Sequence, residues 1–382
     1  MIPPRWLAGL TATAAALALL TLTACGGPTA SAIGQRVEGT TVSTGAPLIS
    51  SGDYWDEVGS AGTDAGVRVY ALERATDQDL YVSVTAEPRA GVDDGLEVTL
   101  KNPAGDRCGS RTADGYASSR EPLMSATVAV SVRSGDACRD ATRLLLTVQR
   151  TGEDDRATRI RMRVTGVAGV QQKQWPTLNA EGQPAQVNVG PSTPGSPGEW
   201  LSDAGVLGNR QTVSGEIGTS ALHTYQIPVQ WGQGLQVQLV FPDPSPTVQQ
   251  ETKDAGLQGG LYLVNAAGEV GNFQSVYLGP GGSTNVDLAP VHYASSRLGY
   301  LPGNYVLVVA LTSEKETQAV IPYQLVASVH GSVNNGLGPQ VVMSTPNSQG
   351  LPEPVLWGML VLGVLLIIAG MAQVTMSRQR QN

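Results

Sequence analysis

Three histidines are the residues whose chemistry would first suggest catalysis: His223, His292 and His330. A hydrolytic triad needs a histidine that activates a serine and is itself oriented by a carboxylate. His223 and His292 each lie near a tyrosine, Tyr225 and Tyr293, but no serine has the Gly-x-Ser-x-Gly setting of a nucleophile elbow. We therefore predict that the chain is not an enzyme and holds no cofactor.

Carboxylates cluster at three places along the chain: Asp93-Asp94, Asp106 and Glu153-Asp154-Asp155. Such loop carboxylates could supply the oxygen ligands that Ca²⁺ prefers, which makes Asp94, Asp106 and Asp155 the calcium candidates. The alternative is that acidic loops keep an exported domain soluble, and this alternative is favoured. We therefore predict no bound metal.

Cys108 and Cys138 form a pair, because the third cysteine, Cys25, lies in the N-terminal signal region. In an oxidising exterior such a pair predicts a disulfide. A metal site is the alternative, but no histidine stands near either cysteine in sequence and the spacing matches no zinc pattern.

Trp55, Trp175, Trp200 and Trp231 stand out in a chain that has only two phenylalanines. Exposed aromatic side chains on β-sandwiches can stack on sugars or anchor a protein partner. Trp231 stands next to a glycine turn just before a strand, so we expect it in a core or at a corner. Trp175 and Trp200 flank a linker, and we expect them to pack two domains together or to contact a partner.

The two ends of the chain predict export and membrane anchoring. Residues 1–32 have the charge and apolar stretch of a secretory signal peptide. Its processing site stays open between Leu22 to Cys25, which resembles a lipobox in which Cys25 would be lipidated, and Ala30-Ser31-Ala32. Residues 355–373 begin with 18 uncharged residues, enough for a transmembrane helix. Arg378 and Arg380 follow, so we expect a cytoplasmic C-terminus and an exterior body.

Between the two anchors the charge is acidic. The exterior part keeps 21 basic residues after Arg5, Arg378 and Arg380 are removed from 24, against 32 acidic residues, which gives 21 − 32 = −11. Such a surface repels phosphate backbones, so we expect no nucleic acid partner.

Alternation with period two runs through the exterior part. In RIRMRV it places Ile160, Met162 and Val164 inward and the three arginines toward water, and LYVSVTA and LQVQLVF repeat the pattern. Outside the signal and the anchor, no stretch has convincing helical spacing. The pattern predicts an all-β, mostly antiparallel ectodomain in which each strand has one wet face.

Two halves of the exterior part repeat the same order of motifs. NPAGD at Asn102 follows LEVTL, and NAAGE at Asn265 follows LYLV, 163 residues later. Other matches keep this order, so we predict a duplicated domain. The expected organisation is a signal peptide at 1–32, β-sandwich domains at 40–166 and 200–332, a Pro/Gly-rich linker at 167–199, a stalk at 333–354, a transmembrane helix at 355–373 and a tail at 374–382.

The motifs GDYWDEV (52–58), WGQGLQVQL (231–239) and LEVTLKNPAG (96–105) resemble the bacterial pre-peptidase C-terminal type of β-sandwich. The chain is also similar to the membrane-proximal region of exported actinobacterial single-pass proteins that carry a von Willebrand A-type domain. That domain and its Asp-x-Ser-x-Ser metal motif are missing from this sequence. The resemblance implies tandem jelly-roll-like sandwiches and hardly constrains function.

We expect a non-enzymatic module on the outside of the cell membrane that binds or scaffolds other exported or cell-envelope proteins. The alternative is a cell-wall glycan-binding module, with or without calcium. Wall-binding assays would separate the two, since only the second predicts retention on purified wall.

Overall fold

A computed structural model of the chain provides the structure. It describes residues 34–88, 92–115, 123–131, 138–169, 186–219, 221–243, 245–278, 282–293, 298–313, 315 and 317–339. The expected signal peptide, Cys25, Trp175, the segment 355–373 and the tail 374–382 lie outside these residues. Within the described ranges, none of the helices has the length and apolar character that crossing a bilayer requires.

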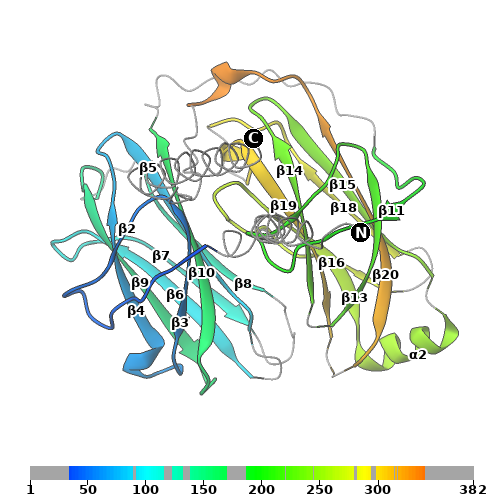
Figure 1. The fold of residues 1–382 in the computed structure, drawn as a ribbon, viewed down its shortest axis with the longest axis horizontal. Helices are drawn as coiled ribbons and strands as arrows, with labels where there is room; N and C mark the ends of the chain where they lie inside the picture. Colours follow the sequence, from blue (N-terminus) through cyan, green and yellow to red (C-terminus); the bar gives the residue numbers. More distant parts are fainter. Residues whose placement is uncertain are drawn as a thin grey trace, which may run out of the picture. The chain divides into compact units, whose positions relative to one another are not determined.

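Two five-stranded sheets form the first β-sandwich, which is coloured blue to green in Figure 1. Their strand orders are β1-β3-β10-β5-β8 and β2-β4-β9-β6-β7. The strands are β1 (Gln35–Arg36), β2 (Leu48–Ile49), β3 (Gly52–Val58), β4 (Val67–Glu73), β5 (Gln78–Ala86), β6 (Asp94–Lys101), β7 (Arg107–Gly115), β8 (Met124–Val130), β9 (Arg143–Gly152) and β10 (Thr158–Ala168). Among the described strands of this sandwich, only the short edge strands β1 and β2 pair in parallel.

The second β-sandwich, green to orange in Figure 1, repeats both sheets with the orders β11-β13-β20-β15-β18 and β12-β14-β19-β16-β17. Its strands are β11 (Thr193–Pro194), β12 (Gly205–Val206), β13 (Thr212–Gly218), β14 (Leu222–Val229), β15 (Gly234–Phe241), β16 (Gln258–Val264), β17 (Gln274–Tyr277), β18 (Gly282–Leu288), β19 (Gly303–Thr312) and β20 (Val320–His330). Edge strand β11 lies inside the segment 167–199 and pairs with β13. The all-β prediction with two sandwiches is confirmed.

Each strand of the second sandwich occupies the place of its counterpart in the first, which is the arrangement that a duplicated domain would have. The turns Asn102–Asp106 and Asn265–Glu269 carry the same repeat at atomic level. In both, the asparagine Oδ1 accepts a hydrogen bond of 2.9 Å from the backbone N–H of the last residue. In both, a glycine adopts positive φ, 95° at Gly105 and 85° at Gly268.

The alternating pattern places the expected side chains in the two cores. Val82 and Val84 on β5 and Ile160 on β10 are fully buried in the first core, between its two sheets. In the second core, Leu235 and Leu239 on β15 are fully buried in the same way. Period two therefore predicted the inward faces correctly, because successive side chains of a strand point to opposite faces.

Helix α2 (Pro246–Ala255) contradicts the expectation that the exterior part contains no helix. The Ser245 hydroxyl caps its N-terminus by accepting from the Val248 N–H, and Pro246 occupies the first turn. Gly256 ends the helix in the left-handed conformation, with φ 62°. Serine and proline at the start and glycine at the stop are recognisable helix boundary signals. The weak amphipathic pattern between them concealed the helix.

Each sandwich supplies a different polar partner to a buried tyrosine at the same place in the fold. In the first, the Tyr70 hydroxyl donates to Asp56 Oδ2 at 2.7 Å. In the second, Tyr225 occupies the place of Tyr70, and its hydroxyl lies 2.8 Å from the Tyr323 hydroxyl. Gly215 stands where the first sandwich has Asp56. A side chain there would not fit, because its Cβ would lie 2.6 Å from the Tyr323 hydroxyl oxygen. Burial raises the pKa of both Tyr70 and Tyr225, so both phenols stay neutral.

The predicted disulfide joins Cys108 on β7 to Cys138. Both sulfur atoms lie near the Asp106 carbonyl oxygen, at 3.7 Å and 4.0 Å. The bond therefore holds the base of the exposed turn Asn102–Asp106. The second sandwich has no cysteine, so this brace belongs to the first sandwich alone.

Candidate functional site at the junction of the two sandwiches

Strand β5 is buried on both faces, which the period-two pattern did not predict. Its outward side chains Tyr81, Ser83 and Thr85 are only 7%, 2% and 4% exposed. The second sandwich covers them: the Tyr81 ring stacks on Tyr300 with centroids 4.9 Å apart, and the Ser83 hydroxyl donates to the Gly268 carbonyl. The two sandwiches are therefore docked along this face, within one compact unit of the chain.

Strand β10 carries the prediction that was wrong in part. Arg159 is exposed as expected, but Arg161 and Arg163 are only partly exposed. Arg163 forms an ion pair with Asp53, with Nε 2.7 Å from Oδ1. The guanidinium carbon of Arg161 lies 4.1 Å from the ring centroid of Trp200, which belongs to the second sandwich. Arg161 and Arg163 lie on the outer face of β10 as predicted, but the second sandwich packs against part of that face.

The docking depends on the absence of a side chain at Gly268. A Cβ there would lie 3.0 Å from the Ser83 Cβ, whereas a Cβ at Gly105 in the equivalent turn would meet nothing within 4 Å. Both glycines have positive φ, so valine strains both backbones similarly. We expect Gly268→Val to destabilise the protein by about 2 kcal/mol more than Gly105→Val, because only the first is overpacked. Equal losses in chemical denaturation would argue against the docking.

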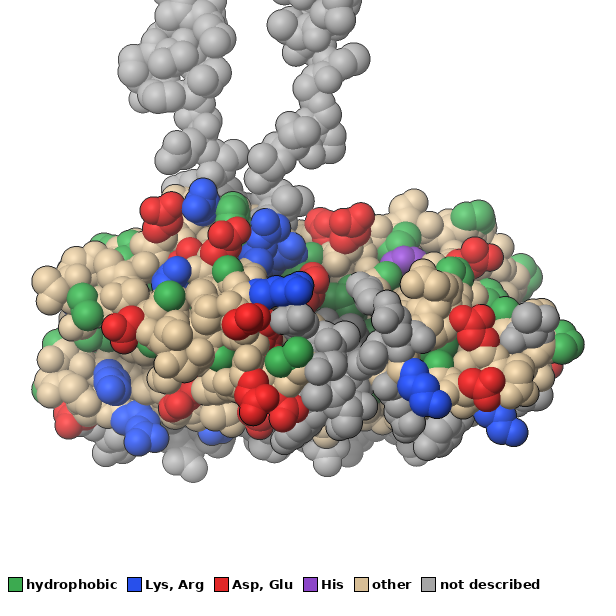
Figure 2. All heavy atoms as spheres, turned by 90° about the horizontal axis from the view of Figure 1, so that it is seen from below, with side chains coloured by type: hydrophobic (Ala, Val, Ile, Leu, Met, Phe, Trp, Pro, Cys, Tyr) green, Lys and Arg blue, Asp and Glu red, His purple; other side chains and the backbone are tan. Residues whose placement is uncertain are grey.

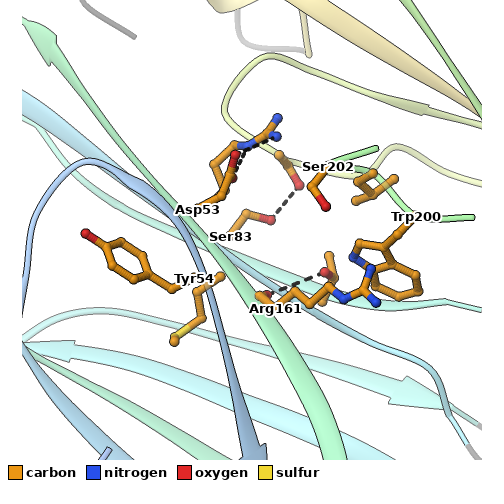
Figure 3. A pocket seen from close by; sticks show the side chains of 11 residues that line it. Asp53, Tyr54, Ser83, Arg161, Trp200 and Ser202 are labelled. Atoms are coloured by element: carbon orange, nitrogen blue, oxygen red, sulfur yellow. Dashed lines mark hydrogen bonds and ion pairs between the residues drawn. The ribbon is translucent and has the colours of Figure 1, made fainter. Parts of the chain in front are cut away.

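A small pocket lies where Trp200 meets the outer face of the first sandwich (Figure 3). Its volume is about 30 Å³, room for roughly one or two water molecules. Ser83 and Asp53 line one side and Trp200 and Ser202 the other, while the Arg161 side chain extends toward the indole. A pocket of this size has no room for a substrate.

A larger groove opens beside this pocket and shares two of its residues, Arg161 and Trp200. We call it the junction groove. Its volume is about 460 Å³. The residues that give it its character are Glu57, Glu87, Thr158, Arg159, Arg161 and Trp200. A groove of this size at the contact of two domains is a common setting for ligand binding.

The two tryptophans near the groove serve as platforms for arginines. Arg159 stands over the Trp55 ring at 4.9 Å, and Arg36 stands over the same ring at 5.3 Å. Arg161 stands over Trp200. A guanidinium on an aromatic face gains cation–π attraction and keeps its N–H groups available at its edge.

Of the two arginines in the groove, Arg161 is the more buried. This burial lowers the pKa of the Arg161 guanidinium, and the Glu87 charge opposes the shift. An arginine pKa starts so far above neutrality that the side chain stays charged. Its Nη1 atom is buried and has no hydrogen-bond partner among the described residues. The inner end of the groove therefore holds a positive charge that the chain itself solvates poorly.

The calcium candidates do not come together. Asp94 and Asp106 lie near opposite ends of β6, which places them roughly 25 Å apart at the strand rise of ~3.3 Å per residue. Asp94 is fully buried and bound to Arg150, whereas Asp155 is exposed in the loop after β9. No group of three metal-binding side chains occurs in the described parts of the chain.

Among the described residues, neither His223 nor His292 has a serine as the hydrogen-bond partner of its Nδ1 atom. His223 Nδ1 is 2.8 Å from the Tyr323 hydroxyl, so its partner is the tyrosine pair of the second core. His292 has a buried Nδ1 without a partner among the described residues. Burial lowers the pKa of both imidazoles, which favours their neutral forms. His330 ends β20 beside Gly234.

The expectations for two tryptophans are confirmed. Trp231 is 4% exposed in the second core, and its Nε1–H donates to the Pro339 carbonyl at 3.1 Å. Trp200 packs the two sandwiches together, since it belongs to a buried cluster that includes Leu123 of the first sandwich. Trp55 is half-buried beneath its two arginines.

Charges of both signs are interspersed over the described residues of the face in Figure 2.

No protein family matches the chain, and no curated protein matches it either. Among solved structures it is similar to the pre-peptidase C-terminal domain of collagenase from Bacillus anthracis, at 14% identity and TM-score 0.21, over 31% of this chain and 93% of that one. It is also similar to the tandem CBM22 domains of Xyn10C from Paenibacillus barcinonensis, at 10% identity and TM-score 0.20, over 73% and 93%. A third similar structure is the PBSX exported protein XepA, at 10% identity and TM-score 0.18, over 72% of this chain and 86% of that one. These TM-scores are too low to carry an argument, so the assignment of two sandwiches rests on the sheet topology.

Sequence reasoning missed the junction groove, although one signal for it was present. The arginines of RIRMRV were correctly placed on the outer face of their strand, and Trp200 was expected at a domain contact. Glu57 and Glu87 carried no signal of their own. Strand pairing within the first sandwich places Glu57 and Glu87 beside β10. The docking then adds Trp200, which is 113 residues from Glu87 in the sequence.

Proposed function

We propose that this chain is a non-enzymatic, membrane-anchored extracellular module that binds another exported or cell-envelope protein, with the junction groove as part of the contact. The apolar segment 355–373 would anchor it, the basic tail would be cytoplasmic, and both sandwiches would lie outside the cell membrane. The likeness of its motifs to pre-peptidase C-terminal-like domains of actinobacterial surface proteins belongs to the same proposal.

The observation that carries the proposal is the composition of the groove. Tryptophan and arginine are the residues that most often dominate the energy of protein interfaces. Here Arg159 and Arg161 lie on one strand and stand over Trp55 and Trp200. The docked sandwiches hold these side chains in place before a partner arrives, which reduces the entropy that binding must overcome.

Glycan binding has less support from the same residues. A sugar-binding tryptophan needs an open ring face. Guanidinium groups stand over the Trp55 and Trp200 rings, and Trp231 is buried.

Crosslinking in native membranes, followed by mass spectrometry of what copurifies with the full-length protein, tests the proposal. We expect one specific exported protein with the wild type and its loss with the double variant Arg159→Ala/Arg161→Ala. Arg143→Ala is the matched control, since Arg143 is an exposed arginine on β9, outside the groove. Recovery of wall fragments alone, or of the same partner with all variants, would contradict the proposed contact.

A further inference from the structure

The charged groups of the junction groove act on one another, since the Glu87 and Asp203 charges oppose the lowering of the Arg161 pKa, but they form no close ion pair among the described residues. Arg159 and Arg161 of β10 line the groove, together with Glu57 of β3 on one side of that strand and Glu87 after β5 on the other. None of the four forms an ion pair with any residue that the structure describes. Ion pairs do form nearby, as between Arg163 and Asp53 one step along the same strand. The four open charges are thus a property of the groove rather than of the whole face.

The strand register explains how they are arranged. Arg159 lies opposite Glu57 of β3, and Arg161 lies opposite Trp55 of β3 and Thr85 of β5. The two arginines are two residues apart on one strand, hence roughly 7 Å apart on the same face. Arg161 is half-buried at the inner end, whereas Arg159 is exposed at the outer end. Glu57 and Glu87 are also exposed, so both signs are offered where a ligand enters.

These features select a ligand class. A polyanion would be attracted by the two guanidinium groups but repelled by the two carboxylates, and a polycation the reverse. For either ligand, the cost of desolvation and repulsion offsets the free energy gained by attraction. A neutral sugar would leave all four charges unpaired. A ligand with one carboxylate and one ammonium group offers a partner to charges of both signs. Arginine binds a carboxylate through two parallel hydrogen bonds.

We propose that the junction groove binds a short peptide stretch that carries both a carboxylate and an ammonium group. The carboxylate pairs with Arg161 and Arg159, and the ammonium pairs with Glu87. The volume of about 460 Å³ lies in the range of pockets that enclose ligands of this size. This inference rests on the proposed function, because it names the chemistry by which a protein partner would be recognised.

Two sources could supply this chemistry: the free ends of a short chain, or acidic and basic side chains within a longer one. The probes are therefore tri-alanine with both ends free, its N-acetylated and its C-amidated forms, and the doubly capped peptide acetyl-Asp-Ala-Lys-amide. Calorimetric titration of the full-length protein compares them. We expect binding of tri-alanine or of the doubly capped peptide, and binding at least about tenfold weaker when either charged end of tri-alanine is blocked.

Variants of the groove give the decisive comparison. Glu87→Gln changes an exposed side chain and should leave the fold intact. We expect it to weaken tri-alanine severalfold but to leave the N-acetylated form unchanged, whereas Arg161→Ala should weaken every peptide with a carboxylate. Arg143→Ala should change nothing. Equal effects of Glu87→Gln on free and acetylated peptides, or no binding of any probe, would overturn the inference.

The two proposals fail separately. If no probe binds but the crosslinked partner is still lost with Arg159→Ala/Arg161→Ala, the peptide chemistry is wrong and the proposed function stands. If the partner is also insensitive to that double variant, both are wrong.

Discussion

Asp94→Ala is expected to lower the free energy of unfolding by about 3 kcal/mol, and added calcium is expected not to restore it. Asp94 binds the buried Arg150 through both carboxylate oxygens, at 2.8 Å and 2.9 Å. Asp154 pairs with the same guanidinium. Burial lowers the pKa of Arg150, but the hydrogen bonds and charges of these two aspartates more than offset this and raise it. Removal of Asp94 leaves buried N–H groups of a charged side chain without acceptors, which is costly.

Chemical denaturation with and without calcium measures this effect. Asp155→Ala, in the separate run Glu153-Asp154-Asp155, is the control because its side chain is exposed, and we expect a loss within about 1 kcal/mol. A calcium-dependent gain of stability in the wild type that disappears in Asp94→Ala would contradict our interpretation. It would mean that Asp94 serves as a metal ligand and not as the partner of Arg150.

Loss of the disulfide is expected to have an effect of similar size. The double variant Cys108→Ala/Cys138→Ala should be less stable by on the order of 3 kcal/mol, since the bond closes a loop across a sequence separation of 30 residues. The Cys138 side chain is also fully buried in the first core, so alanine there removes packing as well.

A reductant provides the test for this variant. Reduced wild-type protein should unfold at a lower denaturant concentration than oxidised protein, whereas the double variant should unfold at the same concentration with or without reductant. Because no cysteine lies in the second sandwich, amide exchange should increase mainly around β7 and the turn Asn102–Asp106. Exchange that increases equally in both sandwiches would show that the bond stabilises more than its own surroundings.

The inward-facing residues, the repeat and the cysteine pair could be predicted because each is encoded locally. Val82 and Val84 needed only the period of the strand that carries them. The turns at Asn102 and Asn265 needed only the Asn-x-x-Gly pattern, since the asparagine side chain accepts a hydrogen bond within the turn itself. Even the missed helix α2 had its signals in Ser245 and Gly256.

The calcium candidates show where local reasoning ended. Asp94 and Asp155 look alike as acidic loop residues, but one is fully buried against an arginine 56 residues away and the other is exposed. The sequence around an acidic residue does not predict whether that residue will be buried against an arginine, because this depends on strand pairing.

By itself, the sequence determined that two sandwiches of the same pattern would form, which faces of their strands would be buried in each core, and that Cys108 and Cys138 would be a pair. Only the tertiary structure decided that β5 is buried on its second face, that Arg161 meets Trp200 instead of water, and that four unpaired charges line one groove. The physical reason is range: period and turn chemistry act over a few residues, whereas the docking joins Ser83 to Gly268, 185 residues apart.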